Sequence, residues 1–300
     1  MSSRRNATLS GIAAILLWSL LATMTAASGA LPPFQLLAMS FGIAFLLGLA
    51  VLHYRGDVRE SLRQPFAAAL LATSALFGYH ALYFVALKQA PVVEANLVNY
   101  LWPLLIVLFA ALLPDTTMRP GQLVGTLLGL AGAALVVTRG ERIAIDAAHA
   151  PGYLAALGAA LTWAAYSVAN RRYAEVPSAA IVGPCGATAL LGAIAHLAFE
   201  RTVVPTIGQW LAAGAMGLGP VGAAFWLWDD GTKRGDLAML GLLSYAAPLL
   251  STLWLLLAGH ADPHPTQAIA AVLLVAGGLL GVVQGRKAGS GTLMRRAQSK

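Results

Sequence analysis

The sequence predicts an all-α polytopic membrane protein with ten transmembrane helices, arranged as two inverted-topology repeats of five helices each. Its 300 residues are 58% hydrophobic and only 10% charged, and the mean hydropathy is +0.73. A soluble globular domain is typically about a quarter charged, so this chain has too little polar surface to be one. Apolar runs of roughly 20 residues, the length that crosses a bilayer as a helix, recur from end to end.

The predicted helices follow one another with mostly short connections, so sequential helices are expected to be antiparallel neighbours. The spans are residues 8–28, 33–52, 66–87, 91–113, 121–138, 152–172, 179–199, 208–228, 237–258 and 266–285. The first run follows Arg4 and Arg5 and resembles a signal peptide. It is long, lacks a clear cleavage site and has a counterpart later in the chain, so we interpret it as a span. The basic tail, residues 287–300, is predicted to be disordered.

The distribution of Lys and Arg predicts the orientation of the chain. Lys88, Arg139, Arg142 and Arg201 fall on one side of the predicted topology, and all the others of the 19 basic residues fall on the other side. Because cytoplasmic loops carry an excess of Lys and Arg, both termini are predicted to be cytoplasmic. The net charge of +7 is therefore interpreted as a topology signal, and no nucleic-acid partner is expected.

The chain repeats itself at a constant offset of 145 residues. The matched pairs are Trp18 and Trp163, Lys88 and Lys233, Tyr100 and Tyr245, Pro103 and Pro248, Pro120 and Pro265, and Gln122 and Gln267. Five helices per half is an odd number, so the second half must enter the membrane from the opposite side. Residues 1–140 and 141–286 are thus predicted to be inverted repeats, which in transporters commonly hold the substrate site at their interface, near the bilayer midplane.

One polar and aromatic stretch occurs in both halves. Asn96–Leu105 reads Asn-Leu-Val-Asn-Tyr-Leu-Trp-Pro-Leu-Leu, and Gly241–Leu250 reads Gly-Leu-Leu-Ser-Tyr-Ala-Ala-Pro-Leu-Leu. Pro103 and Pro248 fall mid-span, where each removes an intrahelical hydrogen bond. We predict that they are hinges, the alternative being that they shape a static cavity. The first-half copy is expected to supply most of the polar and aromatic contacts.

These features resemble the drug/metabolite transporter superfamily, and specifically its EamA-type ten-helix exporters. The resemblance rests on the five-plus-five repeat, on Trp in helices one and six, and on Pro-Leu-Leu in helices four and nine. Gly-Tyr-His at 78–80, Tyr83, and Asn-Tyr-Leu-Trp-Pro at 99–103 are similar to the bacterial aromatic amino-acid exporters. The resemblance implies a secondary transporter of the bacterial inner membrane that exports aromatic and other neutral amino acids. It implies alternating access through a central cavity between the repeats, and we expect a functional monomer.

Apolar and aromatic walls with a few placed polar groups are typical of a small-molecule pocket. We predict such a pocket near the midplane, where Trp18, Trp102 and Trp163 lie too deep to be interfacial anchors, while anchoring at the interface stays an alternative for the other aromatic residues. The candidate substrate-binding residues are Trp18, Tyr79, His80, Tyr83, Asn99, Tyr100, Trp102, Trp163, Ser244 and Tyr245. His80 is the only histidine deep in a predicted span, and its unperturbed pKa near 6.5 would let it titrate. Proton coupling, substrate contact and a purely structural hydrogen bond all remain open for it.

The 12 acidic residues all fall in predicted connections except Glu94, which leaves no mid-membrane carboxylate. Carboxylate-gated proton antiport of cationic drugs is therefore disfavoured, and facilitated diffusion is at least as plausible as proton antiport. Lys88 and Lys233 end helices three and eight, where they are interpreted as snorkelling anchors, or alternatively as helix caps or parts of a gate.

Other function classes find little support. The sequence has no Walker A glycine loop and no His-Glu-x-x-His motif. We expect no cofactor, no bound metal and no enzymatic activity, because an enzyme would need a nucleophile and a base paired at membrane depth. The alternatives kept open are broad-specificity efflux of toxic amphiphilic compounds and, from a different class, an intramembrane enzyme or scaffold.

Overall fold

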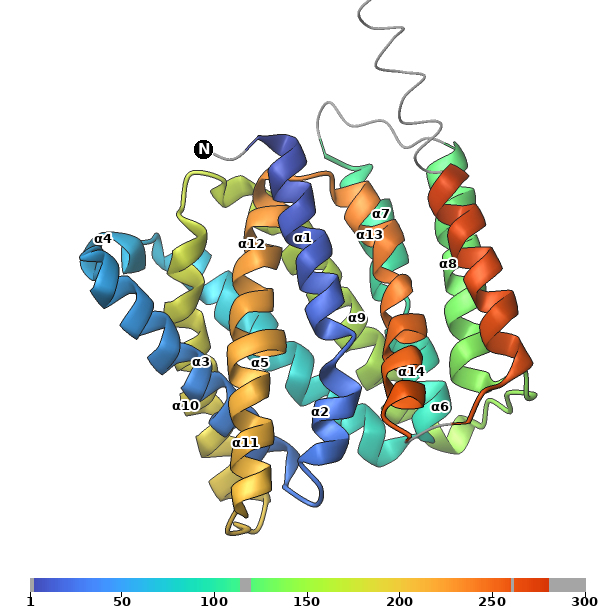
Figure 1. Cartoon of the computed structure of the whole chain (residues 1–300), viewed down its shortest axis with the longest axis horizontal. Coiled ribbons are helices and arrows are strands. Elements are labelled where there is room, and N and C mark those ends of the chain that lie inside the picture. Colours follow the sequence, from blue (N-terminus) through green and yellow to red (C-terminus); the bar gives the residue numbers. More distant parts are fainter. Residues whose placement is uncertain (1–2, 114–119, 260–261, 281–300) are drawn as a thin grey trace, which may run out of the picture.

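Helices occupy the regions where the sequence predicts membrane spans (Figure 1). The computed structural model describes residues 3–113, 120–259 and 262–280. All regular secondary structure within these residues is helical. The predicted tail, residues 287–300, lies outside the described residues.

The first half begins at the N-terminus and ends with α8. Its helices are α1 (Arg4–Trp18), α2 (Leu21–Ala27), α3 (Pro33–Arg55), α4 (Val58–Leu62), α5 (Phe66–Gln89), α6 (Val92–Asn99), α7 (Trp102–Ala110) and α8 (Pro120–Thr138). The short helix α4 lies at the edge of the bundle, beside the end of α3 (Figure 1).

The second half contains α-helices, short 3₁₀ turns and one π-helical segment. They are η1 (Ala147–His149), α9 (Ala150–Ala169), η2 (Asn170–Tyr173), η3 (Ser178–Ile181), α10 (Val182–Phe199), α11 (Ile207–Met216), the π-helical η4 (Gly217–Ala223), α12 (Ala224–Arg234), α13 (Leu237–Ser244) and α14 (Ala246–Leu257). A further helix, Pro265–Leu280, ends where the described part of the chain ends.

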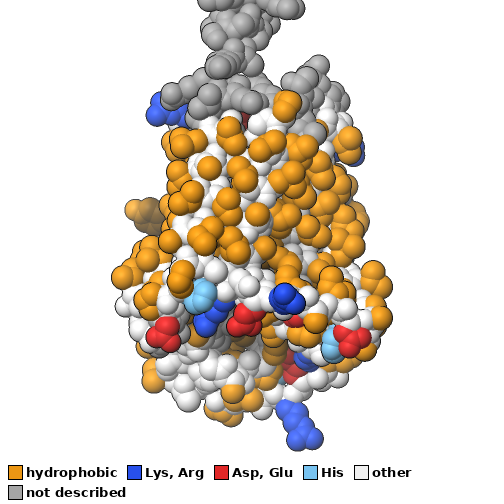
Figure 2. Space-filling model, turned by 90° about the vertical axis from the view of Figure 1, so that its right-hand side faces the viewer, with side chains coloured by type: hydrophobic (Ala, Val, Ile, Leu, Met, Phe, Trp, Pro, Cys, Tyr) orange, Lys and Arg blue, Asp and Glu red, His pale blue; other side chains and the backbone are white. Residues whose placement is uncertain are grey.

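The surface of the bundle is suited to lipid. Within the described residues, nine helical stretches are long and apolar enough to cross a membrane, and Pro265–Leu280 is a shorter apolar helix. Large apolar side chains project outward, such as Leu46, Ile194 and Val272 with 64%, 55% and 68% of their surface exposed. Figure 2 shows a broad hydrophobic band with charged and histidine side chains gathered at its lower edge. The prediction of an all-α polytopic membrane protein is therefore confirmed.

Several helix bounds in the two halves coincide when one half is shifted by 145 residues. Helix α6 (Val92–Asn99) matches α13 (Leu237–Ser244) at both ends, and α8 and the last described helix begin at Pro120 and Pro265. The most extensive helix pairings join α3 with α10, α5 with α9, and α1 with α12. Residues of α1 shifted by 145 fall in α9, and those at the end of α5 fall in α12. The pairing of α1 with α12 therefore corresponds to the pairing of α9 with α5.

Small residues allow the closest of these approaches. A Cβ atom added to Gly125 of α8 would lie 2.5 Å from the carbonyl oxygen of Gly277, and the reverse substitution meets Gly125 at the same distance. Between α1 and α12, a Cβ on Gly231 would lie 2.8 Å from the Cα atom of Gly11. These glycines bring backbones together where no hydrophobic driving force acts between lipid-facing helices.

Two spans are interrupted next to the matched prolines. Helix α6 ends at Asn99 and α7 begins at Trp102, so that Pro103 is the second residue of the new helix. In the second half α13 and α14 meet at Tyr245, and Pro248 is the third residue of α14. Proline is tolerated in the first turn of a helix because the N–H group that it lacks has no intrahelical partner there.

Candidate functional site

Five aromatic side chains meet in the centre of the bundle, and we call them the central aromatic cluster. They are Trp18 of α1, Trp102 of α7, Trp163 of α9, and Phe225 and Trp228 of α12. The ring centroid of Trp18 lies 4.9 Å from that of Trp228, 5.6 Å from Trp163, 5.7 Å from Phe225 and 6.5 Å from Trp102. Most of these contacts are edge-to-face, a geometry that favours aromatic pairs beyond simple burial.

Residues related by the 145-residue offset contact each other within this cluster and at its edge. Trp18 contacts its counterpart Trp163, and His80 contacts its counterpart Phe225 with ring centroids 6.4 Å apart. Trp228 also has an aromatic counterpart, Tyr83, but the two rings have different neighbours. Trp228 contacts Trp18, Trp102 and Trp163, whereas Tyr83 stacks on Tyr79 at 6.0 Å.

A set of hydrogen-bonding side chains lies beside the cluster, and we call it the α5–α6 polar group. It comprises Tyr79 and Tyr83 of α5 together with Asn96 and Asn99 of α6. Asn99 Nδ2 donates to the Tyr79 hydroxyl at 3.1 Å, and the Tyr83 hydroxyl donates to Asn96 Oδ1. Tyr79 also contacts Trp163 at 5.6 Å, so the polar group adjoins the aromatic cluster.

One atom of the polar group is left without a partner. The Asn99 side chain is only 5% exposed, and its Oδ1 atom is buried with no hydrogen-bond donor in the described part of the protein. A buried polar atom without a partner typically costs about 1–3 kcal/mol. An amide oxygen kept in this condition next to aromatic rings is suited to accept a hydrogen bond from a ligand.

The break between α6 and α7 explains why Asn99 lies there. Asn99 is the last residue of α6, and Pro103 has no N–H group to donate to its carbonyl oxygen. The N–H of Leu104 donates to the Tyr245 hydroxyl at 3.2 Å. The end of α6 therefore presents backbone carbonyls with partial negative charge, which favours a cationic group nearby.

The other predicted site residues have different environments. His80 bonds through Nδ1 to the carbonyl oxygen of Leu76 at 2.6 Å, and its ring touches Phe41 and Phe84. Tyr100 caps the end of α6 and is half-buried.

The hydroxyl groups of Ser244 and Tyr245 are hydrogen-bonded to backbone groups of neighbouring helices or of their own helix. The Ser244 hydroxyl donates to the carbonyl oxygen of Leu240 at 2.7 Å, and Tyr245 is fully buried with its hydroxyl on Leu104. The ring of Tyr245 also packs over Gly129, where an added Cβ would come within 2.7 Å of it. The structure thus brings Trp18, Trp102 and Trp163 together, whereas the hydroxyls of Ser244 and Tyr245 are bound to backbone groups.

Three residues of the assembled site were not among the predicted site residues. Asn96 shares a helical face with Asn99, while Phe225 and Trp228 are the offset counterparts of His80 and Tyr83. Applying the repeat to helix three would have identified both aromatic residues of α12. Within the described residues, no group of three or more His, Cys, Asp and Glu side chains is placed to hold a metal ion.

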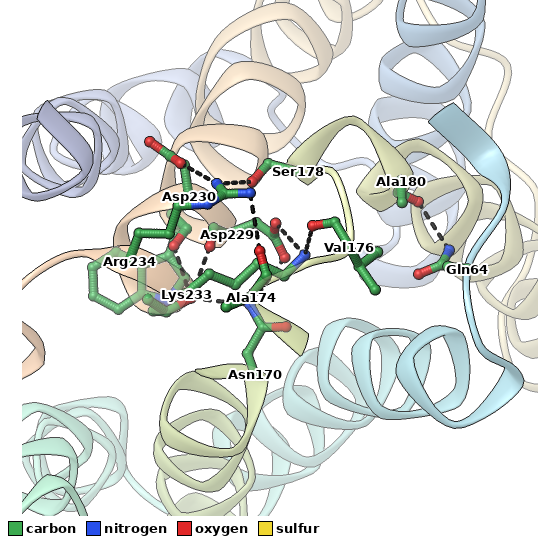
Figure 3. A network of polar contacts seen from close by, with 12 residues as sticks. Gln64, Asn170, Ala174, Val176, Ser178, Ala180, Asp229, Asp230, Lys233 and Arg234 are labelled. Atoms are coloured by element: carbon green, nitrogen blue, oxygen red, sulfur yellow. Dashed lines mark hydrogen bonds and ion pairs between the residues drawn. The ribbon is translucent and has the colours of Figure 1, made fainter. Parts of the chain in front are cut away.

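The prediction that no carboxylate but Glu94 enters a span is wrong. Helix α12 continues past residue 228 to Arg234 and carries Asp229 inside the bundle, where this residue is 3% exposed. Asp229 forms an ion pair with Lys233 at 2.7 Å and accepts a hydrogen bond from Asn170 Nδ2 at 2.9 Å (Figure 3). The four-residue spacing places both charges on one helical face, where they neutralise each other.

The interpretation of Lys233 as a snorkelling anchor is also wrong. Its side chain is buried, and Nζ donates to the carbonyl oxygen of Val176 at 3.1 Å (Figure 3). Arg234, the next residue, pairs with Asp230 and donates to the carbonyl oxygen of Ala174 at 3.2 Å. This network attaches α12 to the connection that follows α9. Lys88, the counterpart of Lys233 in the other half, is exposed.

The chain is similar to known proteins over most of its length. The sequence profile of the EamA-like transporter family matches residues 6–138 and again residues 150–283. A relative from Ancylobacter novellus, named aromatic amino acid exporter YddG, is 49% identical over 286 residues, which cover 95% of this chain and 100% of the relative. The protein of the same name from Escherichia coli K12 is 28% identical over 265 residues, covering 83% of this chain and 87% of that protein. A solved crystal structure with 49% sequence identity superimposes with a TM-score of 0.90 and covers 95% of this chain and 99% of that one.

Proposed function

The chain belongs to the EamA-like transporter family, and from this membership we propose that it exports aromatic and other neutral amino acids across the bacterial inner membrane. The full-length similarity to an aromatic amino acid exporter supports the substrate class. The observation that carries the proposal is the unpartnered Asn99 oxygen at the meeting point of the central aromatic cluster and the α5–α6 polar group. An aromatic amino acid has a ring that can pack against the central aromatic cluster and charged groups that can bind the α5–α6 polar group.

The polar group is complementary to a zwitterion. Asn99 Oδ1 and the carbonyls at the end of α6 are acceptors, which suit the three N–H bonds of an α-ammonium group. The Tyr79 hydroxyl accepts from Asn99 and keeps its own hydrogen, which it can donate to the α-carboxylate. We place Tyr83, Tyr100, Trp102 and Trp163 around the side chain of the substrate, and assign Ser244 and Tyr245 to the scaffold.

Inverted repeats with boundaries at residues 1–140 and 141–286 are the architecture that we propose for this site. The family profile matches each half separately, which supports the division. The coincident helix bounds and the equivalent pairings of α1 with α12 and α5 with α9 support a pseudo-two-fold relation. The contacts of Trp18 with Trp163 and of His80 with Phe225 support an axis through the central aromatic cluster.

For this architecture we propose alternating access, with the breaks at Pro103 and Pro248 as hinges and both termini in the cytoplasm. Trp228 lies near the end of α12 on the side of the N-terminus and contacts tryptophans of both halves. Its counterpart Tyr83 makes its ring contact, within the described residues, with Tyr79 of its own half. This difference between Trp228 and Tyr83 supports a state that is closed on the N-terminal side. In the opposite state, closed on the other side, Tyr83 would contact both halves and Trp228 would not.

Flux measurements in proteoliposomes test the proposal. Purified protein should accelerate the movement of radiolabelled phenylalanine, tryptophan and leucine down their gradients, relative to protein-free liposomes. A pH gradient applied at constant amino-acid gradient separates facilitated diffusion from proton antiport. The flux through a facilitator does not change with the pH gradient, whereas the flux through a proton antiporter does. Transport of cationic dyes without any amino-acid flux would instead favour broad efflux of amphiphiles.

A further inference from the structure

The helix that carries Phe225 and Trp228 is interrupted by a π-helical segment, η4 (Gly217–Ala223). It lies between α11 and α12, inside the candidate span Ile207–Arg234. The counterpart residues 72–78 lie within the uninterrupted helix α5. π-Helical turns are rare and are frequently found at functional sites, and this one occurs in only one of the two matched spans.

The sequence of η4 explains its geometry. Pro220 supplies no N–H group to the helix, so a regular α-helical ladder cannot be completed through it. Gly222 is required next to it, because a Cβ atom there would collide with the carbonyl oxygen of Gly217. A Cβ on Gly217 would lie 2.7 Å from the carbonyl oxygen of Ser40, so the segment is also pressed against α3.

Within the described residues, one side-chain hydrogen bond joins the segment to the first half of the protein, in addition to its packing against α3. Trp18 Nε1 donates to the carbonyl oxygen of Pro220 at 2.9 Å. The ring of Trp18 contacts Phe225 and Trp228, which follow η4 by a few residues. One indole therefore holds the π-helical segment through its N–H group and packs against the aromatic residues whose direction that segment sets.

The π geometry determines which way these residues face. A π turn accommodates one residue more than an α turn, and one residue rotates an α-helix by about 100°. Conversion of η4 to regular helix would therefore turn Phe225 and Trp228 by about that angle relative to α11. They would then point away from Trp18 and Trp163.

We propose that Trp18 is a positioning residue for transport, and that its hydrogen bond to Pro220 holds η4 as the hinge between α11 and α12. This role rests on the proposed transport function. It differs from the substrate contact expected for Trp18, because the polar atom of the indole is bound to protein and the ring is surrounded by other rings.

Trp18→Phe is the direct test, since it keeps an aromatic ring and removes the donor. The maximal rate of phenylalanine export should fall by about threefold to tenfold, the rate equivalent of one ordinary hydrogen bond, while KM stays within about twofold. The matched control is Trp254→Phe, which removes an indole N–H that donates to Ser19 Oγ at 2.9 Å. It deletes the same group beside Trp18 without touching η4, and its export rate should equal that of the wild type.

Pro220→Ala provides a second variant, because it restores an N–H group and lets η4 become regular helix. It should lower the rate as well, and the double variant Trp18→Phe/Pro220→Ala should lose less than the product of the two single losses. A raised KM with an unchanged maximal rate in Trp18→Phe would overturn the proposal and make Trp18 a substrate contact. Independent effects of the two substitutions would overturn it as well.

Hydrogen exchange tests the inference without any substrate. Backbone amides of η4 should exchange faster in Trp18→Phe than in the wild type and in Trp254→Phe. Unchanged protection of η4 in Trp18→Phe would refute the positioning role even if the protein exports amino acids. Conversely, faster exchange in a protein that moves no amino acid would refute the proposed function alone.

Discussion

At the scale of single residues, one amide oxygen distinguishes the α5–α6 polar group from a closed hydrogen-bond network. Tyr83, Asn96 and the amide nitrogen of Asn99 all have partners, and Asn99 Oδ1 has none within the described residues. A buried oxygen without a donor destabilises the fold, and this one lies beside the central aromatic cluster. Under the proposed function, the donor to this oxygen arrives with the substrate.

Asn99→Leu tests this role, because leucine keeps the size of the side chain and removes the acceptor, together with the amide N–H that donates to the Tyr79 hydroxyl. We expect KM for phenylalanine to rise by about tenfold, which corresponds to the loss of one hydrogen bond to a charged group. 3-Phenylpropionate, which has the ring and the carboxylate without the ammonium group, is the matched control ligand. Its inhibition of phenylalanine flux should be equal in the variant and the wild type. A uniform loss of affinity for both molecules would argue against the assignment.

The Asp229–Lys233 pair allows a prediction about stability. Lys233→Met leaves a buried carboxylate without its counter-charge, which typically destabilises a protein by about 3–5 kcal/mol. The double variant Asp229→Asn/Lys233→Met removes both charges and should recover most of that stability. Thermal unfolding in detergent measures the difference.

Lys88→Met is the internal control for that measurement, because Lys88 is the exposed counterpart of Lys233. It should leave the unfolding temperature unchanged. If Lys233→Met were equally harmless, the buried ion pair would have no part in holding α12 to the connection after α9.

The aromatic residues of the candidate site are easier to recognise in the sequence than the buried charges of α12. A tryptophan or tyrosine at midplane depth is recognisable from its distance to the ends of the span. Asp229 was misplaced because the hydrophobic run ends at residue 228, whereas the helix continues as a result of contacts with Lys233 and with Asn170 from another helix. Burial that depends on a partner distant in the sequence cannot be read from local hydropathy.

At the scale of helices, the prolines predicted interruptions but not their form. Both matched prolines lie in the first turn of a new helix rather than at a kink within one continuous helix. The π-helical η4 was not predicted, although Gly217, Gly219, Pro220 and Gly222 form a visible cluster of helix-breaking residues. Such a cluster is compatible with a loop, a kink or a π turn, and packing against α3 and Trp18 selects among them.

Gly125→Ala tests the close packing of α8 against the helix Pro265–Leu280. The added methyl group would meet the backbone of Gly277, which cannot move aside as a side chain would, and such overpacking costs about 1–3 kcal/mol. We expect a lower unfolding temperature and an unchanged export rate per folded molecule. Gly214→Ala in α11 is the control, because nothing lies within 4 Å of its added Cβ and alanine favours the helix. A variant Gly125→Ala as stable as the wild type would contradict the packing.

At the scale of the whole molecule, the two halves have matching helices at the 145-residue offset but differ in individual contacts. The sequence pairs Trp18 with Trp163 through the 145-residue offset, and the two rings lie in contact, although the offset alone did not predict that contact. It could not anticipate the differences, namely the buried ion pair and the π-helical segment, which both lie in the helix that contains α12. A transporter with two identical halves would have no preferred closed side, so these differences are where a preference between states would be set.

Counterflow tests the central claim, that one central site alternates between the two sides and carries aromatic amino acids. Proteoliposomes are loaded with unlabelled tryptophan and diluted into a trace of labelled phenylalanine. Labelled phenylalanine should accumulate transiently inside above its external concentration, because each tryptophan that leaves through the site turns the empty site toward the outside, where phenylalanine binds. Folded protein in tight vesicles that takes up phenylalanine no faster with internal tryptophan than without it would contradict the account.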